Sequence, residues 1–125
     1  MQNKIIEINI TVGEYYDRLS ILHLKTQKIK DINKINLVRE EYNYLLSKQV
    51  SIDENLYNSL ITVNELIWNE EEKIRFLDRK CQWDSEFIEC SRSIHKLNDQ
   101  RNVIKNTISN KFGSNPEVKS HGDIQ

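Results

Sequence analysis

Polar side chains recur at helical spacing inside the longest helical pattern of this 125-residue chain. Between residues 60 and 80 a polar stripe has apolar residues on both flanks, which turns the stripe toward the interior. Glu71 and Arg75 belong to it, and Arg101 falls at the centre of the next helix's apolar stripe. A buried charge is costly unless it is paired, so we expect Glu71 and Arg101 to share a network with Arg75 or Asn98. This polar seam consists of Asn64, Trp68, Glu71 and Arg75 on one helix and Asn98, Arg101 and Lys105 on the next.

Carboxylate and guanidinium groups inside a helical bundle can serve several purposes. They can fix the register of the helices, at some cost in stability, and the protein is then a helical adaptor with a purely structural seam. They can line a pocket for a small anionic ligand, with the arginines as bidentate donors. They can also perform acid–base catalysis on a small acidic metabolite, with Glu71 as the acid or base. No Gly-rich phosphate loop, HExxH motif or nucleophile elbow is present in the sequence.

Composition excludes several other classes of function. Charged residues make up 30% of the chain, yet its formal net charge is only −1, so neither nucleic acid nor an anionic membrane is an expected partner. No apolar run approaches the roughly 20 residues that span a bilayer. The first residues lack the features of a signal peptide, which predicts a cytoplasmic protein. Cys81 and Cys90 fit no zinc spacing, so we expect no metal and no cofactor.

Helical periodicity covers most of the chain and predicts an all-α, four-helix bundle-like single domain over residues 1–125. Thr11 and Glu14 have capping-box spacing, Asp84 can cap the last helix, and Gly113 followed by Pro116 ends it. The third and fourth helices are long and joined by a short turn, so they should pack as an antiparallel hairpin. The expected helices run from Val12–Glu14 to about Ile32, over Ile35–Val50, over Glu54–Lys80 and over Ser85–Phe112.

One short segment has the alternation of a strand instead. In residues 4–12, Ile6, Ile8 and Ile10 point one way, and polar residues point the other way. The pattern predicts a strand with these isoleucines mostly buried. Its edge needs a partner, which is either the tail around Pro116–Lys119 or the same segment of a second subunit in a homodimer.

Two charged residues lie on an edge of the first helix. Glu14 and Arg18 are four residues apart, a spacing that gives a surface ion pair worth a few tenths of a kcal/mol. Alternatively, this edge borders the polar seam, and both residues then belong to the site.

Several motifs together resemble a known family. They are Gly13-Glu14-x-x-Asp17-Arg18-Leu19-Ser20-Ile21-Leu22-x-x-Lys25, then Asn64-x-x-x-Trp68-x-x-Glu71-x-x-x-Arg75, then Arg92 and Asn98-Asp99-x-Arg101-x-x-x-Lys105, and finally Gly113-Ser114 with Glu117 and Lys119. In these motifs the chain resembles a family of small bacterial helical proteins that is catalogued as a domain of unknown function. The resemblance implies a compact helical protein, sometimes encoded near glycan-building enzymes, with no established activity. His121 stands where the family usually has an aromatic residue.

The resemblance also adds Arg92 and Asp99 to the candidate site. We therefore expect a binding or accessory protein whose seam holds a small anionic ligand that bears a phosphate or a sugar, with catalysis and a purely structural seam as alternatives. The candidate ligand-binding residues are Glu14, Arg18, Asn64, Trp68, Glu71, Arg75, Arg92, Asn98, Asp99, Arg101 and Lys105.

Overall fold

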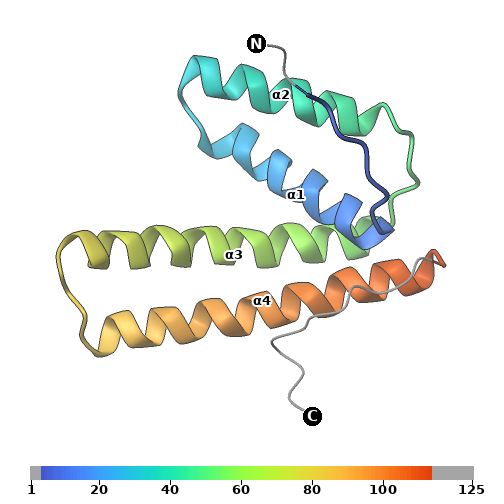
Figure 1. Cartoon of the computed structure of the whole chain (residues 1–125). Coiled ribbons are helices and arrows are strands. Elements are labelled where there is room, and N and C mark those ends of the chain that lie inside the picture. Colours follow the sequence, from blue (N-terminus) through green and yellow to red (C-terminus); the bar gives the residue numbers. More distant parts are fainter. Residues whose placement is uncertain (1–3, 114–125) are drawn as a thin grey trace.

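The computed structural model describes residues 4–113, which form four α-helices. They are α1 (Val12–Lys28), α2 (Ile32–Leu46), α3 (Glu54–Arg79) and α4 (Ser85–Lys111), as Figure 1 shows. The predicted all-α class is confirmed. α2 begins earlier than expected because the Asp31 carboxylate accepts hydrogen bonds from the backbone N–H groups of Asn33 and Lys34. α1 ends before it, because Ile29 already has an extended backbone, and the turn between the two helices contains no glycine or proline.

Side-chain oxygens cap the other helices as well. Thr11 Oγ1 accepts from the Glu14 N–H at 3.1 Å, and Asp53 does the same for α3. Asp84 caps α4, as predicted. Gly113 follows α4 with a φ of +76°, a conformation that favours glycine and closes a helix. None of the helices within residues 4–113 is long and apolar enough to cross a membrane.

The helices are stacked in layers (Figure 1). α3 and α4 run antiparallel along most of their length and form the predicted hairpin. α1 lies across one half of the hairpin and contacts both of its helices, whereas α2 packs on α1. The arrangement differs from a regular four-helix bundle because α1 alone joins the hairpin to the outer layer.

The apolar core forms where α1 meets the hairpin. Its buried members are Tyr15, Tyr16, Leu19, Leu60, Val63 and Ile108. The Tyr16 hydroxyl donates to the Ser51 carbonyl at 2.7 Å and accepts from the Asp53 N–H at 2.8 Å. This side chain therefore anchors the connection between α2 and α3 to the first turns of α1.

Gly13 lets the start of α1 approach the backbone of α4. Its N–H donates to Ser109 Oγ at 2.9 Å, and a Cβ at this position would lie 2.1 Å from the Lys105 carbonyl oxygen. No side chain larger than hydrogen fits without moving one of the two helices. Gly13 thereby sets the position of the next turn of α1, which carries Asp17.

The expected strand over residues 4–12 is wrong for the described chain. No strand is assigned between residues 4 and 113, and Val12 already belongs to α1. Ile6 and Ile8 are 76% and 68% exposed, not buried. An extended segment becomes a strand only when a neighbour pairs with its backbone, and the described helices offer no such edge. The suggested partner around Pro116–Lys119 lies outside the described residues.

We predict that Gly13→Ala destabilises the protein by about 2 kcal/mol or more, because the added methyl group collides with α4. At an exposed position inside a helix the same change would stabilise the protein by up to about 1 kcal/mol. The sign of the change in stability therefore distinguishes the two situations. Urea unfolding followed by circular dichroism measures the difference. A more stable variant would contradict the close approach.

Candidate functional site

The buried carboxylate of Asp17 lies at the point where α1, α3 and α4 meet. It is 1% exposed. Arg101 Nε donates to its two oxygens at 2.9 and 3.1 Å, and a terminal guanidinium nitrogen of Arg101 also donates to Oδ2. Asn64 Nδ2 donates to Oδ1 at 2.9 Å, and Lys105 Nζ lies 3.8 Å from Oδ2. One carboxylate on α1 thus binds side chains from both helices of the hairpin.

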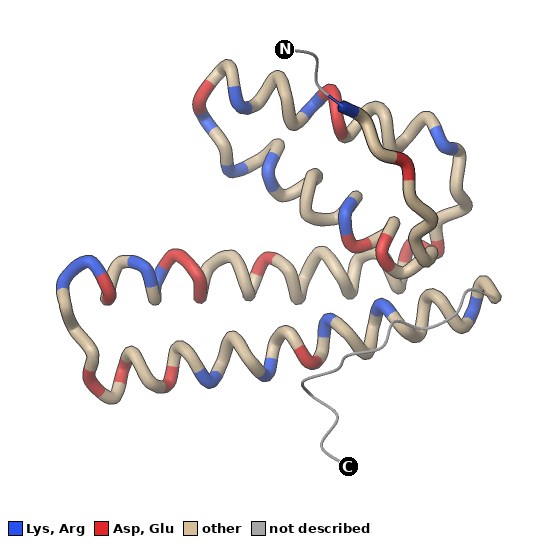
Figure 2. Tube along the Cα trace, in the orientation of Figure 1, with Lys and Arg blue, Asp and Glu red and all other residues tan. Residues whose placement is uncertain are grey.

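Further hydrogen bonds extend this cluster on both sides. Asn64 also donates to Ser20 Oγ at 2.8 Å, and Ser20 donates to the Asp17 backbone carbonyl at 2.7 Å. Lys105 Nζ donates to Glu14 Oε2 at 2.7 Å. We call the set the Asp17 network, and its members are Glu14, Asp17, Ser20, Asn64, Arg101 and Lys105. Figure 2 shows the acidic positions at the start of α1 and the basic positions of the second half of α4 at the same end of the molecule.

Every charge of the Asp17 network is paired. Its two carboxylates, Glu14 and Asp17, meet the cations of Arg18, Arg101 and Lys105, and none of its side chains has a buried polar atom without a hydrogen-bond partner. Removing one member of such a buried pair typically costs about 3–5 kcal/mol, because the other charge is stranded. The network is therefore a structural junction.

A pocket of about 260 Å³ opens directly beside the network. Arg101 belongs to both, and Trp68 forms part of the pocket wall. Trp68 Nε1 donates to Glu72 Oε1 at 2.8 Å, and the Arg75 guanidinium lies 4.0 Å from the Glu71 carboxylate. The Arg75 side chain is 73% exposed, so this contact is a weak surface pair. The lining residues are Ile21, Leu24, Asn64, Ile67, Trp68, Glu71, Glu72, Arg75 and Arg101.

The pocket combines three kinds of surface. Two guanidinium groups can bind an acidic group, the Trp68 ring and its aliphatic neighbours can bind an apolar or planar body, and the Glu71 and Glu72 carboxylates can accept hydrogen bonds from hydroxyls. Within residues 4–113, no group of three His, Cys, Asp or Glu side chains is placed to hold a metal ion.

The buried thiol of Cys90 is a poor candidate for a nucleophile. Its sulfur donates to the Glu70 carbonyl and carboxylate at 3.2 and 3.0 Å. Burial, together with the negative charge of Glu70, raises the pKa of this thiol to about 11. It therefore stays protonated at neutral pH, whereas the reactive form of a cysteine is the thiolate.

The structure brings most of the predicted site residues together. Asn64, Trp68, Glu71, Arg75 and Arg101 line the pocket, and Glu14 and Lys105 join the Asp17 network. The other predicted residues do not line the pocket; they are Arg18, Arg92, Asn98 and Asp99.

Arg18 is exposed and pairs with Glu14 at 2.9 Å, the surface pair that its spacing allowed. Arg92 and Asp99 are exposed on α4, and Asn98 is half-buried; none of the three lines the pocket. The carboxylate that holds Arg101 is that of Asp17, whereas Glu71 pairs with Arg75.

Asp17 and Ser20 were missing from the predicted site, although both stand in the motif of the resemblance. A signal was available in the sequence: Gly13, Asp17, Ser20 and Leu24 share one stripe of the first helix, and a stripe of small and polar residues permits close helix contact. A search for regularly spaced large apolar residues finds the neighbouring apolar stripe of this helix, but it does not find the stripe that carries Asp17 and Ser20.

We predict that Asn64→Ala costs about 2–3 kcal/mol of unfolding free energy, because it leaves a cavity and removes donors from Asp17 and Ser20. Asn69→Ala is the matched control on the exposed side of the same helix, and it should change stability by less than about 0.5 kcal/mol. Chemical denaturation of both variants makes the comparison. Equal effects would contradict a buried role for Asn64.

Comparison with known proteins identifies the family of this chain. No curated protein and no solved structure matches the chain. Residues 6–119 match a family described as a family of unknown function, DUF6165. The match covers every motif of the resemblance noted in the sequence and all four described helices. The chain therefore belongs to the DUF6165 family of unknown function.

Proposed function

We propose that this protein is a binding or accessory protein that holds a small ligand in the pocket between α1, α3 and α4. The ligand carries one acidic group, a phosphate or a carboxylate, on a hydroxylated, sugar-like body. The observation that supports this proposal is that Arg75, Arg101 and Trp68 line the same pocket. The cytoplasmic location expected from the sequence and the gene neighbours implied by the resemblance stay predictions.

The side chains of Arg101 and Arg75 differ in how freely they can move. Arg101 is fixed by its ion pair with Asp17, so its guanidinium group has a set position at the pocket before any ligand arrives. Arg75 has an exposed side chain and only a 4.0 Å contact with Glu71, so it can turn toward a bound group at little cost. A preorganised donor and an adaptable donor together suit an acidic group that enters from solvent.

The carboxylates of the pocket restrict the ligand further. Glu71 and Glu72 would repel a bare multivalent anion, but they accept hydrogen bonds from hydroxyl groups. Trp68 adds an aromatic ring to the lining, and the Lys28 ammonium lies 5.9 Å from the centre of this ring. The volume lies near the lower end of the range for ligand pockets, so a monosaccharide-sized molecule fits better than a dinucleotide.

The alternatives explain less of the molecule. A purely structural seam accounts for the closed Asp17 network but not for the open pocket beside it. Catalysis by Glu71 has less support, because Glu71 pairs with Arg75 and the second pocket carboxylate, Glu72, accepts the hydrogen bond of Trp68. Binding is therefore the better-supported function.

We predict saturable quenching or enhancement of Trp68 fluorescence by a sugar acid or a sugar phosphate. Trp83 is 61% exposed at the end of the hairpin, so Trp83→Phe leaves Trp68 as the only tryptophan without disturbing the core. Glucuronate and glucose 6-phosphate are the probes, and glucose and inorganic phosphate are the controls. Either probe should bind at least tenfold more tightly than glucose or inorganic phosphate alone.

The Arg75→Met variant should weaken that binding at least tenfold, because it removes a charge-assisted hydrogen bond. Arg79→Met, one turn further along α3 and outside the pocket, is the matched control and should bind like the parent. Absence of saturable binding by all four compounds at millimolar concentration would refute the proposed ligand class. Equal losses in the two variants would refute the proposed site.

A further inference from the structure

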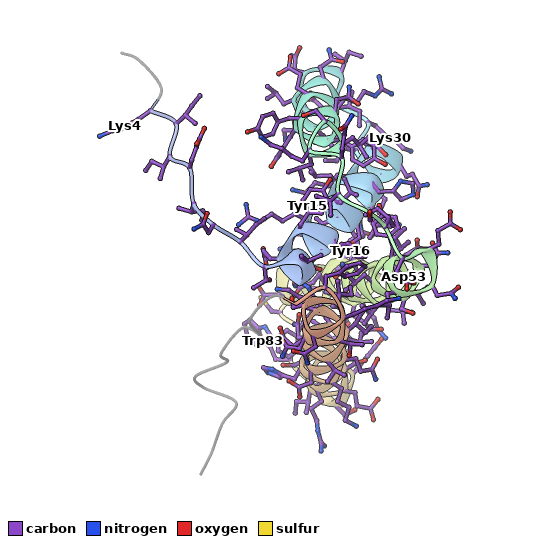
Figure 3. The ribbon with its side chains drawn as sticks, turned by 90° about the vertical axis from the view of Figure 1, so that its right-hand side faces the viewer. Lys4, Tyr15, Tyr16, Lys30, Asp53 and Trp83 are labelled. Atoms are coloured by element: carbon purple, nitrogen blue, oxygen red, sulfur yellow. The ribbon has the colours of Figure 1, made fainter. Side chains whose placement is uncertain are left out.

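The first residues of the described chain form an N-terminal segment, residues 4–11, that is not part of the helical body. In Figure 1 it passes over α2, but the turned view of Figure 3 shows it away from the helices, with Lys4 far out. Ile5, Ile6 and Ile8 are mostly exposed. Within residues 4–113, the backbone of residues 4–10 forms no hydrogen bond. Exposed isoleucines on an unpaired backbone mark an interaction site.

A groove of about 760 Å³ separates the N-terminal segment from the helices. Its far wall includes Tyr15, Tyr44, Leu45 and Val50, which belong to α1, α2 and the connection after α2. Both walls are therefore mainly apolar. A strand-like occupant could pair with the segment and cover this wall at the same time.

We propose that the occupant is the same segment of a second copy of the chain, paired antiparallel about Ile8. The proposal is independent of the pocket and its ligand. The single chain forms no strand here; the second copy would supply the missing hydrogen-bond partners. In this dimer, the two segments form a ribbon, and its apolar face covers the groove walls of both copies. The ribbon needs this cover, because two strands alone are marginally stable in water.

The order of residues in the segment favours this register. Centred on Ile8, the pairing places Ile8 opposite Ile8 and Ile6 opposite Ile10, all on one face, while Glu7 faces Asn9. Moving the centre to Glu7 would place two like charges directly opposite each other, which is destabilising. Moving it to Ile6 would put Glu7 opposite Ile5 and Ile8 opposite Lys4, so charged side chains would face isoleucines. Moving it to Asn9 would pair Ile8 with Ile10 but put Ile6 opposite Val12, which belongs to α1. The Ile8 register is therefore the one that pairs all three isoleucines with one another and places no like charges opposite each other.

Cysteine cross-linking in the full chain tests the register. The exposed Cys81 is first replaced by serine, and the buried Cys90 is kept. Ile8→Cys should form a disulfide-linked dimer under mild oxidation, because residues directly opposite in an antiparallel pair have Cα atoms about 4.5–5.5 Å apart. Ile6→Cys or Ile10→Cys alone should not, since each lies about 14 Å from its own copy. A mixture of the two should cross-link.

Equal cross-linking of all three single variants would indicate random collisions of an exposed segment and would overturn the proposal. So would the absence of any cross-link in the Ile8→Cys variant and in the mixture.

Sedimentation of the unmodified chain gives an independent readout. We expect a dimer at micromolar concentration, and Ile8→Asp should convert it to a monomer with unchanged helix content, because the segment lies outside the core. Leu37→Asp, which changes another exposed residue on α2, should remain dimeric. A monomeric parent, with or without protected amides at residues 5–10, or a dimer that survives Ile8→Asp, would overturn the proposal.

Discussion

The buried carboxylate of Asp17 is the constraint on which the rest of this structure depends. A charge with 1% exposure requires partners, and they come from α3 through Asn64 and from α4 through Arg101 and Lys105. Satisfying one side chain therefore fixes α1 against both helices of the hairpin. Since α2 packs on α1, the outer layer is held through the same junction.

The junction also creates the candidate binding site. Arg101 is held by Asp17 and also lines the pocket, so the ion pair that joins the helices also fixes one guanidinium group of the proposed binding site. The seam thus has a closed, paired half and an open half with Trp68, Glu71 and Arg75. The charges of the first half are buried and paired, whereas those of the second half are more exposed and weakly paired, as is common at functional sites.

Local patterns in the sequence predicted the helices, their caps and the hairpin well, because capping and apolar periodicity depend on neighbours in the chain. The partner of Arg101 depended on a long-range contact: only the approach of Gly13 to α4 brings Asp17 within reach. Alternation of Ile6, Ile8 and Ile10 was equally clear, but a strand requires a second segment that the pattern cannot supply. Arg92 and Asp99 entered the candidate site through resemblance alone, and they lie away from the pocket.

A double-mutant cycle on Asp17 and Arg101 tests the central claim most directly. Asp17→Asn and Arg101→Met should each cost about 3 kcal/mol of unfolding free energy, and the double variant should cost at least about 1.5 kcal/mol less than their sum. The exposed pair Glu71 and Arg75 is the matched control, and its coupling in the Glu71→Gln and Arg75→Met cycle should stay below about 1 kcal/mol. Additive effects of Asp17→Asn and Arg101→Met, within about 0.5 kcal/mol, would contradict the account.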